Sequence, residues 1–287
     1  MKNRTVLVLG ATGNQGGAVV TALLKDHHKI IGVARNVESP NAQKLIDQGV
    51  EMVSADFTDK ASLMELMKKV DTVFAMTTPG WGGDIAAELR QGFNIIDAAK
   101  EANVEHLIYN SVSDANTSTG IGHFDSKYEI EKHLKASGLN YTIVAPAYFY
   151  ENIFFPYVFD AIKADGELRI AMPADTKLQQ ISVADIGKFV GTVVNQGEKM
   201  FGQRINIAGD AISGEEVAKV LTKVLDKKVT YNGFSTDYLK QQSEEMAKMF
   251  DWFNEVGYSA KLEDLAPYHL MTFSQWAEKQ NWAAYLK

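Results

Sequence analysis

The sequence of 287 residues predicts a doubly wound α/β fold, in which helices cover both faces of a parallel sheet, with a smaller C-terminal α/β lobe. Three observations lead to this prediction. Short apolar runs alternate with segments of helical periodicity over the first half of the chain. A glycine-rich turn joins the first apolar run to the first helical segment. Beyond Pro146 the alternation loosens and aromatic residues become frequent.

The elements of the first half are short and regularly spaced. The expected strands lie at 6–9, 30–34, 50–54, 72–76, 106–110 and 141–145. The expected helices lie at 15–26, 42–47, 60–69, 84–102 and 125–136. Strands that alternate with helices pair in parallel, because each crossover returns the chain to the same end of the sheet. Residues 1–150 are therefore expected to form the first domain.

The remaining residues, 151–287, are expected to form the smaller lobe. It has candidate strands at 204–208 and 228–231 and a helix at 213–225, where Ser213 and Glu216 have capping-box spacing. Met and aromatic residues at 246–253 have helical spacing, as in a core or a subunit interface. No Pro- or Gly-rich linker separates the two parts, so the lobes are expected to be interleaved.

Composition excludes several classes of function. A net charge of −7 without a Lys or Arg cluster argues against direct binding of nucleic acid or of anionic membranes. The absence of Cys removes disulfides, thiolate metal sites and Cys nucleophiles. The adjacent His27 and His28 would diverge on a helix, so no metal site is expected. The N-terminal apolar run is too short for a signal peptide, and a cytoplasmic location is expected.

The glycine-rich turn has the spacing GxxGxxG and predicts a dinucleotide site. It reads Gly10, Ala11, Thr12, Gly13, Asn14, Gln15, Gly16. Glycine permits the tight turn and lets the backbone approach a pyrophosphate, while the following helix offers unpaired N–H groups. A strand before it, a helix after it and a second strand beyond complete the Rossmann-type βαβ context. A glycine turn without a ligand is the alternative.

Arg35 at the end of the second strand favours NADP(H) over NAD(H). Sites that prefer NAD carry Asp or Glu near this position for the ribose 2′-hydroxyl, whereas this chain has no acid before Glu38. A guanidinium suits a bidentate contact with a 2′-phosphate, and a surface arginine at a strand end is the alternative. Asp56 and Phe57 follow the third strand, where Asp56 would reach the adenine or, equally, serve as a helix N-cap residue.

Several segments together resemble the NmrA-like family of atypical short-chain dehydrogenase/reductases, most closely its vertebrate redox sensors. The segments are the residues at 10–17, Ala-Arg-Asn at 34–36, Gly-Val-Glu at 49–51, His-Phe-Asp-Ser-Lys at 123–127 and Pro-Ala-Tyr-Phe-Tyr-Glu-Asn at 146–152. The resemblance implies an NADP-binding Rossmann domain with a small C-terminal lobe. It places cofactor contacts at Gly10 to Gln15, Arg35, Asn36, Thr77, Thr78, Lys127, Tyr148, Phe149, Tyr150, Glu151 and Asn152. Within this set, Lys127 would bind the nicotinamide ribose, and residues 148–152 would lie near the nicotinamide.

Catalysis is a separate question, because the reductase motif is altered. Typical reductases of the wider family use Tyr-x-x-x-Lys with an upstream Ser. Here the tyrosine position is His123, the lysine is Lys127, and Ser111 lies at the end of the fifth strand. In one interpretation His123 donates a proton, Ser111 orients a carbonyl or quinone oxygen, and Lys127 holds the cofactor. In the other, His123 is structural and the protein binds its cofactor without turnover.

Three functions follow from these alternatives. The first is an NADP(H)-binding redox sensor or regulator with a protein partner and little or no turnover. The second is an NADPH-dependent reductase of quinone-like or other aromatic acceptors, bound by the aromatic residues at 148–159. The third, weaker one is a scaffold without cofactor. The protein is expected to be a monomer or a homodimer.

Overall fold

The computed structural model describes residues 3–77 and 84–286, which divide into two compact units. Unit 1 comprises Met1–Ser118, Gly122–Ala145 and Val183–Ile205, and unit 2 comprises Thr119–Ile121, Pro146–Ser182 and Asn206–Lys287. The chain passes from unit 1 to unit 2 after residue 145. Residues 183–205 return to unit 1, because their helix packs on the first helix of the chain and the strand that follows joins the central sheet.

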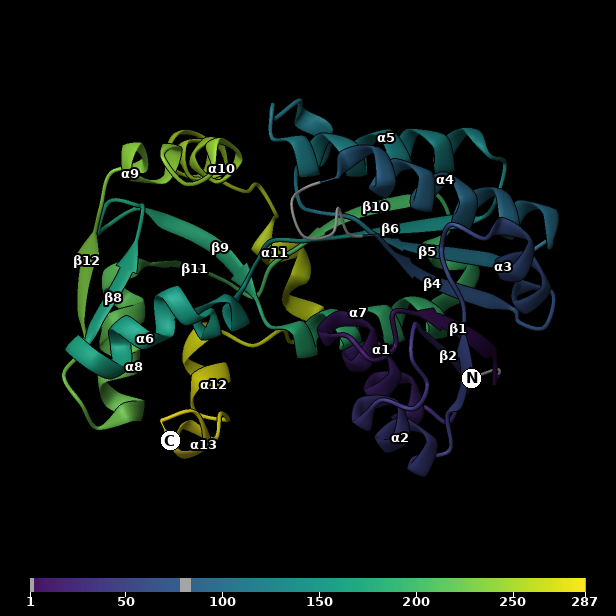
Figure 1. Ribbon diagram of the computed structural model, residues 1–287, viewed down its shortest axis with the longest axis horizontal. Helices are drawn as coiled ribbons and strands as arrows, with labels where there is room; N and C mark the ends of the chain where they lie inside the picture. The colour runs from purple at the N-terminus through teal and green to yellow at the C-terminus, as the bar shows by residue number, and fades with distance from the viewer. Residues whose placement is uncertain (1–2, 78–83, 287) are drawn as a thin grey trace. The chain divides into compact units, whose positions relative to one another are not determined.

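Unit 1 is built on a sheet with the strand order β10-β6-β5-β4-β1-β2-β3 in the described residues (Figure 1). The strands are β1 (Thr5–Leu9), β2 (Lys29–Ala34), β3 (Glu51–Ser54), β4 (Thr72–Met76), β5 (His106–Asn110), β6 (Tyr141–Pro146) and β10 (Gln203–Ile207). The pairings from β3 through β6 are all parallel. The order reverses beside β1, which is the point where open α/β sheets bind ligands at the carboxyl ends of their strands.

Helices cover both faces of this sheet, which confirms the doubly wound fold (Figure 1). They are α1 (Asn14–Lys25), α2 (Pro40–Asp47), α3 (Lys60–Met67), α4 (Ile85–Glu101), α5 (Gly122–Ala136) and α7 (Val183–Gln196), with the short 3-10 helices η1 (Ala115–Thr117) and η3 (Gly197–Met200). Alternate strand residues such as Leu7, Leu9 and Tyr109 pack against α3, α4 and α5 in one buried core.

The other face is covered by α1 and α7, which approach each other closely. A Cβ atom on Gly187 would lie 2.3 Å from the carbonyl oxygen of Ala18, so only glycine fits at this crossing. This contact explains why α7, far along the chain, belongs to unit 1.

Unit 2 contains two small sheets, helices and an aromatic core. In one sheet β9 (Lys177–Ile181) lies between β7 (Tyr148–Phe149) and β11 (Asp210–Ser213), and in the other β8 (Glu167–Ile170) pairs with β12 (Thr230–Gly233). The helices are η2 (Tyr150–Phe154), α6 (Pro156–Asp165), α8 (Gly214–Leu225), α9 (Thr236–Lys240), α10 (Glu244–Glu255), α11 (Leu262–Leu265), η4 (Ala266–Tyr268), α12 (Phe273–Ala277) and α13 (Trp282–Tyr285). The capping box of Ser213 and Glu216 is confirmed at the start of α8.

Two features differ from the sequence expectations. The strand expected at 204–208 in the smaller lobe is β10, an edge strand of the central sheet. The short strands β7, β8, β9 and β11 were not predicted, because they have two to five residues and, in β9, polar residues at most positions. Met249, Phe250 and Phe253 are buried on α10, as expected for a core stripe.

Candidate functional site

The glycine loop lies between β1 and α1, as the βαβ prediction requires. Gly10 has a positive φ of 68°, and its carbonyl accepts a hydrogen bond from Gly13 N at 2.9 Å. A Cβ atom on Gly16 would lie only 2.2 Å from Gly10 O, so the turn closes only with glycine there. The N-cap Gly13 provides no side-chain cap and, with Asn14, is exposed, so the first N–H groups of α1 face solvent. This arrangement fits a pyrophosphate.

Arg35 follows the last residue of β2 and is exposed. Its backbone carbonyl accepts a hydrogen bond from Ser54 Oγ at 3.2 Å, which ties the end of β2 to β3. Its guanidinium has no ion pair or hydrogen bond within residues 3–77 and 84–286. Asn36 folds the next turn, because its Oδ1 accepts from Glu38 N at 2.8 Å. The backbone of Arg35 is therefore fixed by hydrogen bonds of the turn, while its charged side chain is exposed. This combination fits a phosphate at the ribose 2′ position.

Asp56 lies after β3, and the helix cap is a different residue. Asp56 Oδ1 accepts from both the backbone N–H and the hydroxyl of Thr58 at 2.8 Å, and these bonds lower the pKa of Asp56. The N-cap of α3 is Asp59. The exposed Asp56 therefore remains ionised in a turn beside the sheet edge, and the neighbouring Phe57 packs partly on the core.

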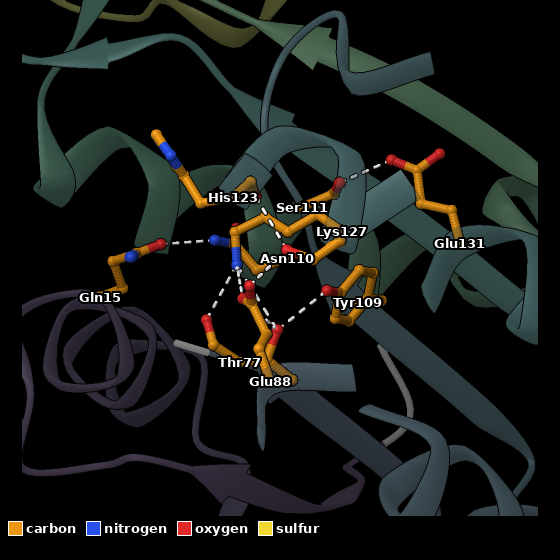
Figure 2. A network of polar contacts seen from close by, with 10 residues as sticks. Gln15, Thr77, Glu88, Tyr109, Asn110, Ser111, His123, Lys127 and Glu131 are labelled. Atoms are coloured by element: carbon orange, nitrogen blue, oxygen red, sulfur yellow. Dashed lines mark hydrogen bonds and ion pairs between the residues drawn. The ribbon is translucent and has the colours of Figure 1, made fainter. Parts of the chain in front are cut away.

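Lys127 is tied to a buried glutamate that the sequence reasoning did not include. Its Nζ lies 2.6 Å from Glu88 Oε1 on α4 and donates to the carbonyl oxygen of Thr77 at 2.9 Å (Figure 2). The hydroxyl of Thr77 donates to the same carboxylate at 2.9 Å. Tyr109 OH lies 3.0 Å from that hydroxyl, and burial raises the pKa of Tyr109 well above its usual range. This phenol is therefore a structural donor. Thr78, also predicted at this strand end, lies outside the described residues.

Ser111 is held in a second buried network. Its Oγ donates to Glu131 Oε1 at 2.6 Å (Figure 2). Glu131 is fully buried and its other oxygen accepts from Arg204 Nε at 2.8 Å, so both carboxylate oxygens act as acceptors. The single proton of Ser111 is therefore committed to Glu131. Toward a ligand, Ser111 offers only acceptor lone pairs, which is the opposite of what orienting a carbonyl oxygen requires.

Asn110 connects the end of β5 to the glycine loop. Its side-chain amide donates to Gln15 Oε1 in the first turn of α1 (Figure 2). Asn110 is 3% exposed, and its Oδ1 has no partner within the described parts of the chain. A buried acceptor without a partner, next to the glycine loop and the carboxyl ends of β4 and β5, fits a ligand donor such as a ribose hydroxyl or an amide.

His123 lies in the first turn of α5, four residues before Lys127. It is half-buried, and its ring contacts Phe124 edge-on with centroids 4.8 Å apart. In Figure 2 the ring points away from Lys127 and Glu88. The helix therefore brings His123 to the same end as Lys127, but its side chain does not take part in the buried carboxylate network.

The segment 148–152 belongs to unit 2 and is anchored there by its side chains. Tyr148 and Phe149 form β7 and pair with β9. Tyr150 is buried, with its hydroxyl donating to Met271 O at 3.0 Å, and Glu151 accepts from Trp276 Nε1 at 3.0 Å. Asn152 hydrogen-bonds to the hydroxyl of Tyr148, whose pKa burial raises above its usual range. The expected contact of this segment with a nicotinamide remains a prediction.

Two cavities lined by described residues of unit 2 differ in size. The first, beside Tyr148, Tyr150 and Asn152, measures about 40 Å³, which is room for a few water molecules. The second measures about 350 Å³ and is lined by Ala208, Gly209, Leu262, Leu265, Ala266, His269, Leu270, Thr272 and Gln275. Ligand pockets measure about 300–1,000 Å³, so of these two cavities the second has the size of a ligand site. The binding of an aromatic acceptor by the residues at 148–159 stays a prediction.

The sequence did not reveal two carboxylates that bond the predicted site residues: Glu88 bonds Lys127, and Glu131 bonds Ser111. Glu88 and Glu131 are fully buried, although each lies on a helix. The sequence does hold a signal for Glu88, because it shares the spacing of the apolar face of its helix: it lies three residues after Ile85 and seven before Ile95.

Among the described residues no group of three His, Asp or Glu side chains could hold a metal ion. No described helix has both the length and the apolar character that crossing a membrane requires.

Comparison with known proteins places these features in a family. The NmrA-like family matches residues 2–286. An NmrA-like family domain-containing protein of Dictyostelium discoideum is 28% identical over 271 residues, covering 89% of each chain. Quinone oxidoreductase 2 of Escherichia coli is 30% identical over 234 residues, covering 80% of this chain and 78% of the relative.

Two solved structures share the fold. An NADPH-dependent quinone oxidoreductase of Escherichia coli in complex with NADPH superimposes with a TM-score of 0.79 at 26% identity, covering 95% of this chain and 98% of that one. The negative transcriptional regulator NmrA in complex with NAD gives a TM-score of 0.81 at 20% identity, covering 97% and 95%. With the family matched over nearly the whole length, the chain belongs to the NmrA-like family.

Proposed function

We propose that the protein binds NADP(H) and acts as a sensor or regulator of cofactor state, with little or no turnover. One observation carries the proposal: the glycine loop and Arg35 are open to a ligand, whereas the hydroxyl that would orient an acceptor oxygen is bonded to a buried carboxylate. The glycine loop closes, the first turn of α1 is open to solvent, and Arg35 has no counter-ion in residues 3–77 and 84–286. By contrast, the Ser111 proton is committed to Glu131.

The cofactor would be held at three places by residues of this chain. Backbone N–H groups of the glycine loop and the start of α1 would bind the pyrophosphate. Arg35 would bind the 2′-phosphate, and Lys127 would bind the nicotinamide ribose. When bound, the nicotinamide supplies a hydride, and a proton donor must accompany it to reduce a carbonyl. In the enzyme interpretation His123 would supply that proton, and its ring points away from Lys127 (Figure 2). Ser111 cannot donate a hydrogen bond to the carbonyl oxygen while Glu131 accepts its proton.

The binding half of this proposal is tested by Arg35→Ala. A lost charge-assisted contact is worth about 1–3 kcal/mol, so NADPH affinity should fall about 5- to 150-fold while NADH affinity stays unchanged. Quenching of intrinsic fluorescence during titration measures both. Lys29→Ala, at the opposite end of β2 and with the same change of charge, is the matched control and should bind both cofactors like the wild type. Equal losses for NADPH and NADH in Arg35→Ala would contradict the 2′-phosphate assignment.

A second candidate function is an NADPH-dependent reductase of quinone-like acceptors. It is favoured by the 30% identity to quinone oxidoreductase 2 and by the cavity of about 350 Å³ in unit 2. The two functions are separated by NADPH consumption with a panel of quinones, nitroaromatics and aldehydes. Steady turnover that His123→Ala abolishes would replace the sensor by the reductase. Tight NADPH binding with no consumption across the panel supports the sensor.

A further inference from the structure

Glu88 is a buried carboxylate with a full set of donors. Its side chain has no exposed surface, although it lies in the first turn of α4. Oε1 accepts from Thr77 Oγ1 at 2.9 Å and from Lys127 Nζ at 2.6 Å, and Oε2 accepts from Ser126 Oγ at 2.5 Å. The amino-terminal turn of a helix also stabilises a negative charge. These three donors therefore fix the Glu88 carboxylate in place, independently of any ligand.

One donor of Lys127 makes only a long contact. An ammonium group has three N–H donors, and two of them make short contacts, toward Glu88 at 2.6 Å and toward the carbonyl oxygen of Thr77 at 2.9 Å. The third contact, with Thr77 Oγ1, measures 3.5 Å, at the outer limit for a hydrogen bond, so this N–H is the one that a ligand can take over. The side chain is 13% exposed, so the group is not fully closed off from solvent. Without Glu88 the buried ammonium would lack its counter-ion, and its flexible stem would let it turn toward water.

We propose that Glu88 is a positioning residue for the cofactor: it holds the Lys127 ammonium so that its third N–H meets the nicotinamide ribose. The inference rests on the proposed NADP(H) binding. Glu88 makes no ligand contact itself and acts through Lys127. Ser126 and Thr77 fix the two carboxylate oxygens, so the position of the ammonium is set by β4, α4 and α5 together.

The test uses two ligands that differ at the nicotinamide end. NADPH has the nicotinamide ribose, whereas 2′,5′-ADP has the adenosine and the 2′-phosphate but no nicotinamide ribose. Affinities of wild type, Glu88→Gln, Lys127→Met and the double variant are measured for both by titration calorimetry. We expect each single substitution to weaken NADPH by about tenfold or more, with the affinity for 2′,5′-ADP unchanged. The double variant should be no weaker than Lys127→Met alone, because both substitutions remove one contact.

Several results would overturn the inference. Equal losses for NADPH and 2′,5′-ADP would mean that Glu88 only supports the fold, and additive losses in the double variant would mean that it acts apart from Lys127. Tighter NADPH binding by Glu88→Gln would make Glu88 a competitor of the cofactor. Full NADPH affinity in Lys127→Met would overturn this inference while the proposed function stands. Failure of the wild type to bind either ligand would overturn the proposed function, and this inference with it.

Ser126→Ala keeps the test decisive if Glu88→Gln does not fold. It removes the donor to Oε2 and leaves the ion pair of Glu88 with Lys127 intact. A smaller loss, about two- to fivefold and confined to NADPH, supports positioning by Glu88. An equal loss for both ligands counts against it.

Discussion

Substitution of Ser111 by alanine separates a catalytic serine from a structural one. The hydroxyl donates to Glu131 at 2.6 Å, in a network that continues to Arg204 Nε at 2.8 Å and from Arg204 to the carbonyl of Val112 at 3.0 Å. Ser111 is 4% exposed and Glu131 is fully buried. Removing the hydroxyl leaves one oxygen of a buried carboxylate without its donor, and water has little access to replace it.

The magnitude follows from the charge and the burial of the acceptor. A hydrogen bond to a charged group contributes about 1.5–3 kcal/mol, and an unsatisfied buried acceptor costs about as much. The ion pair of Glu131 with Arg204 remains, so the loss is expected within that range. For a domain of this size each kcal/mol shifts Tm by about 2–4 °C, which predicts a decrease of about 3–12 °C.

Urea unfolding followed by circular dichroism measures the loss, and the NADPH titration is repeated on the same sample. Ser137→Ala is the control, because its hydroxyl donates to a neutral backbone carbonyl and its loss should cost about 1 kcal/mol or less. We expect lower stability for Ser111→Ala with NADPH binding retained. The reasoning is refuted if Ser111→Ala is as stable as the wild type and instead abolishes a measurable quinone reduction.

Two further predictions follow from the glycine loop and from a buried histidine. Gly16→Ala places a Cβ atom 2.2 Å from Gly10 O and should weaken NADPH binding by about tenfold or more. In the control Gly17→Ala the new Cβ atom lies 3.4 Å from Ala11 O, so this variant should bind NADPH normally. Equal NADPH affinities of the two variants in a calorimetric titration would contradict the prediction. Burial and the nearby Arg4 charge lower the pKa of His106 to about 4. As the pH falls from about 6.5 to 4, His106 therefore gains a proton in the unfolded chain but not in the folded one. The free energy of unfolding should fall by about 3 kcal/mol over this range. Urea unfolding at pH 7 and pH 5 measures this change in the free energy of unfolding. The change should be smaller for His106→Gln than for the wild type or for the exposed control His27→Asn. The same change in all three proteins would count against the assignment to His106.

The first half of the fold was predictable because its short strands alternate regularly with helices of helical periodicity. Each of the strands β1 to β6 is a short apolar run between helices of eight or more residues, and their observed limits agree closely with the expected ones. In unit 2 the strands have two to five residues, and each pairs with a partner far along the chain. Sequence periodicity over so few residues does not distinguish a strand from a loop.

The candidate site likewise has a part that the sequence predicts and a part that it does not. The glycine loop and Arg35 are local features, because the strand–turn–helix order alone brings them to the carboxyl edge of the sheet. The networks of Lys127 and Ser111 are not local, because Glu88 reaches Lys127 across 39 residues and Arg204 reaches Glu131 across 73. No spacing rule predicts such pairs.

The sequence by itself determined the parallel α/β fold, the glycine loop and the basic residue at the end of β2. Each depends on residues within one βαβ unit, where hydrophobic periodicity and glycine geometry act over short distances. Only the tertiary structure decided the hydrogen-bond partners of Lys127 and Ser111. Packing of α4 and α5 on the sheet buries Glu88 and Glu131, and a buried carboxylate must take its donors from whatever lies beside it. Those donors are Lys127 and Ser111, so the hydrogen-bonding capacity of both predicted site residues is set by partners that the linear sequence does not place next to them.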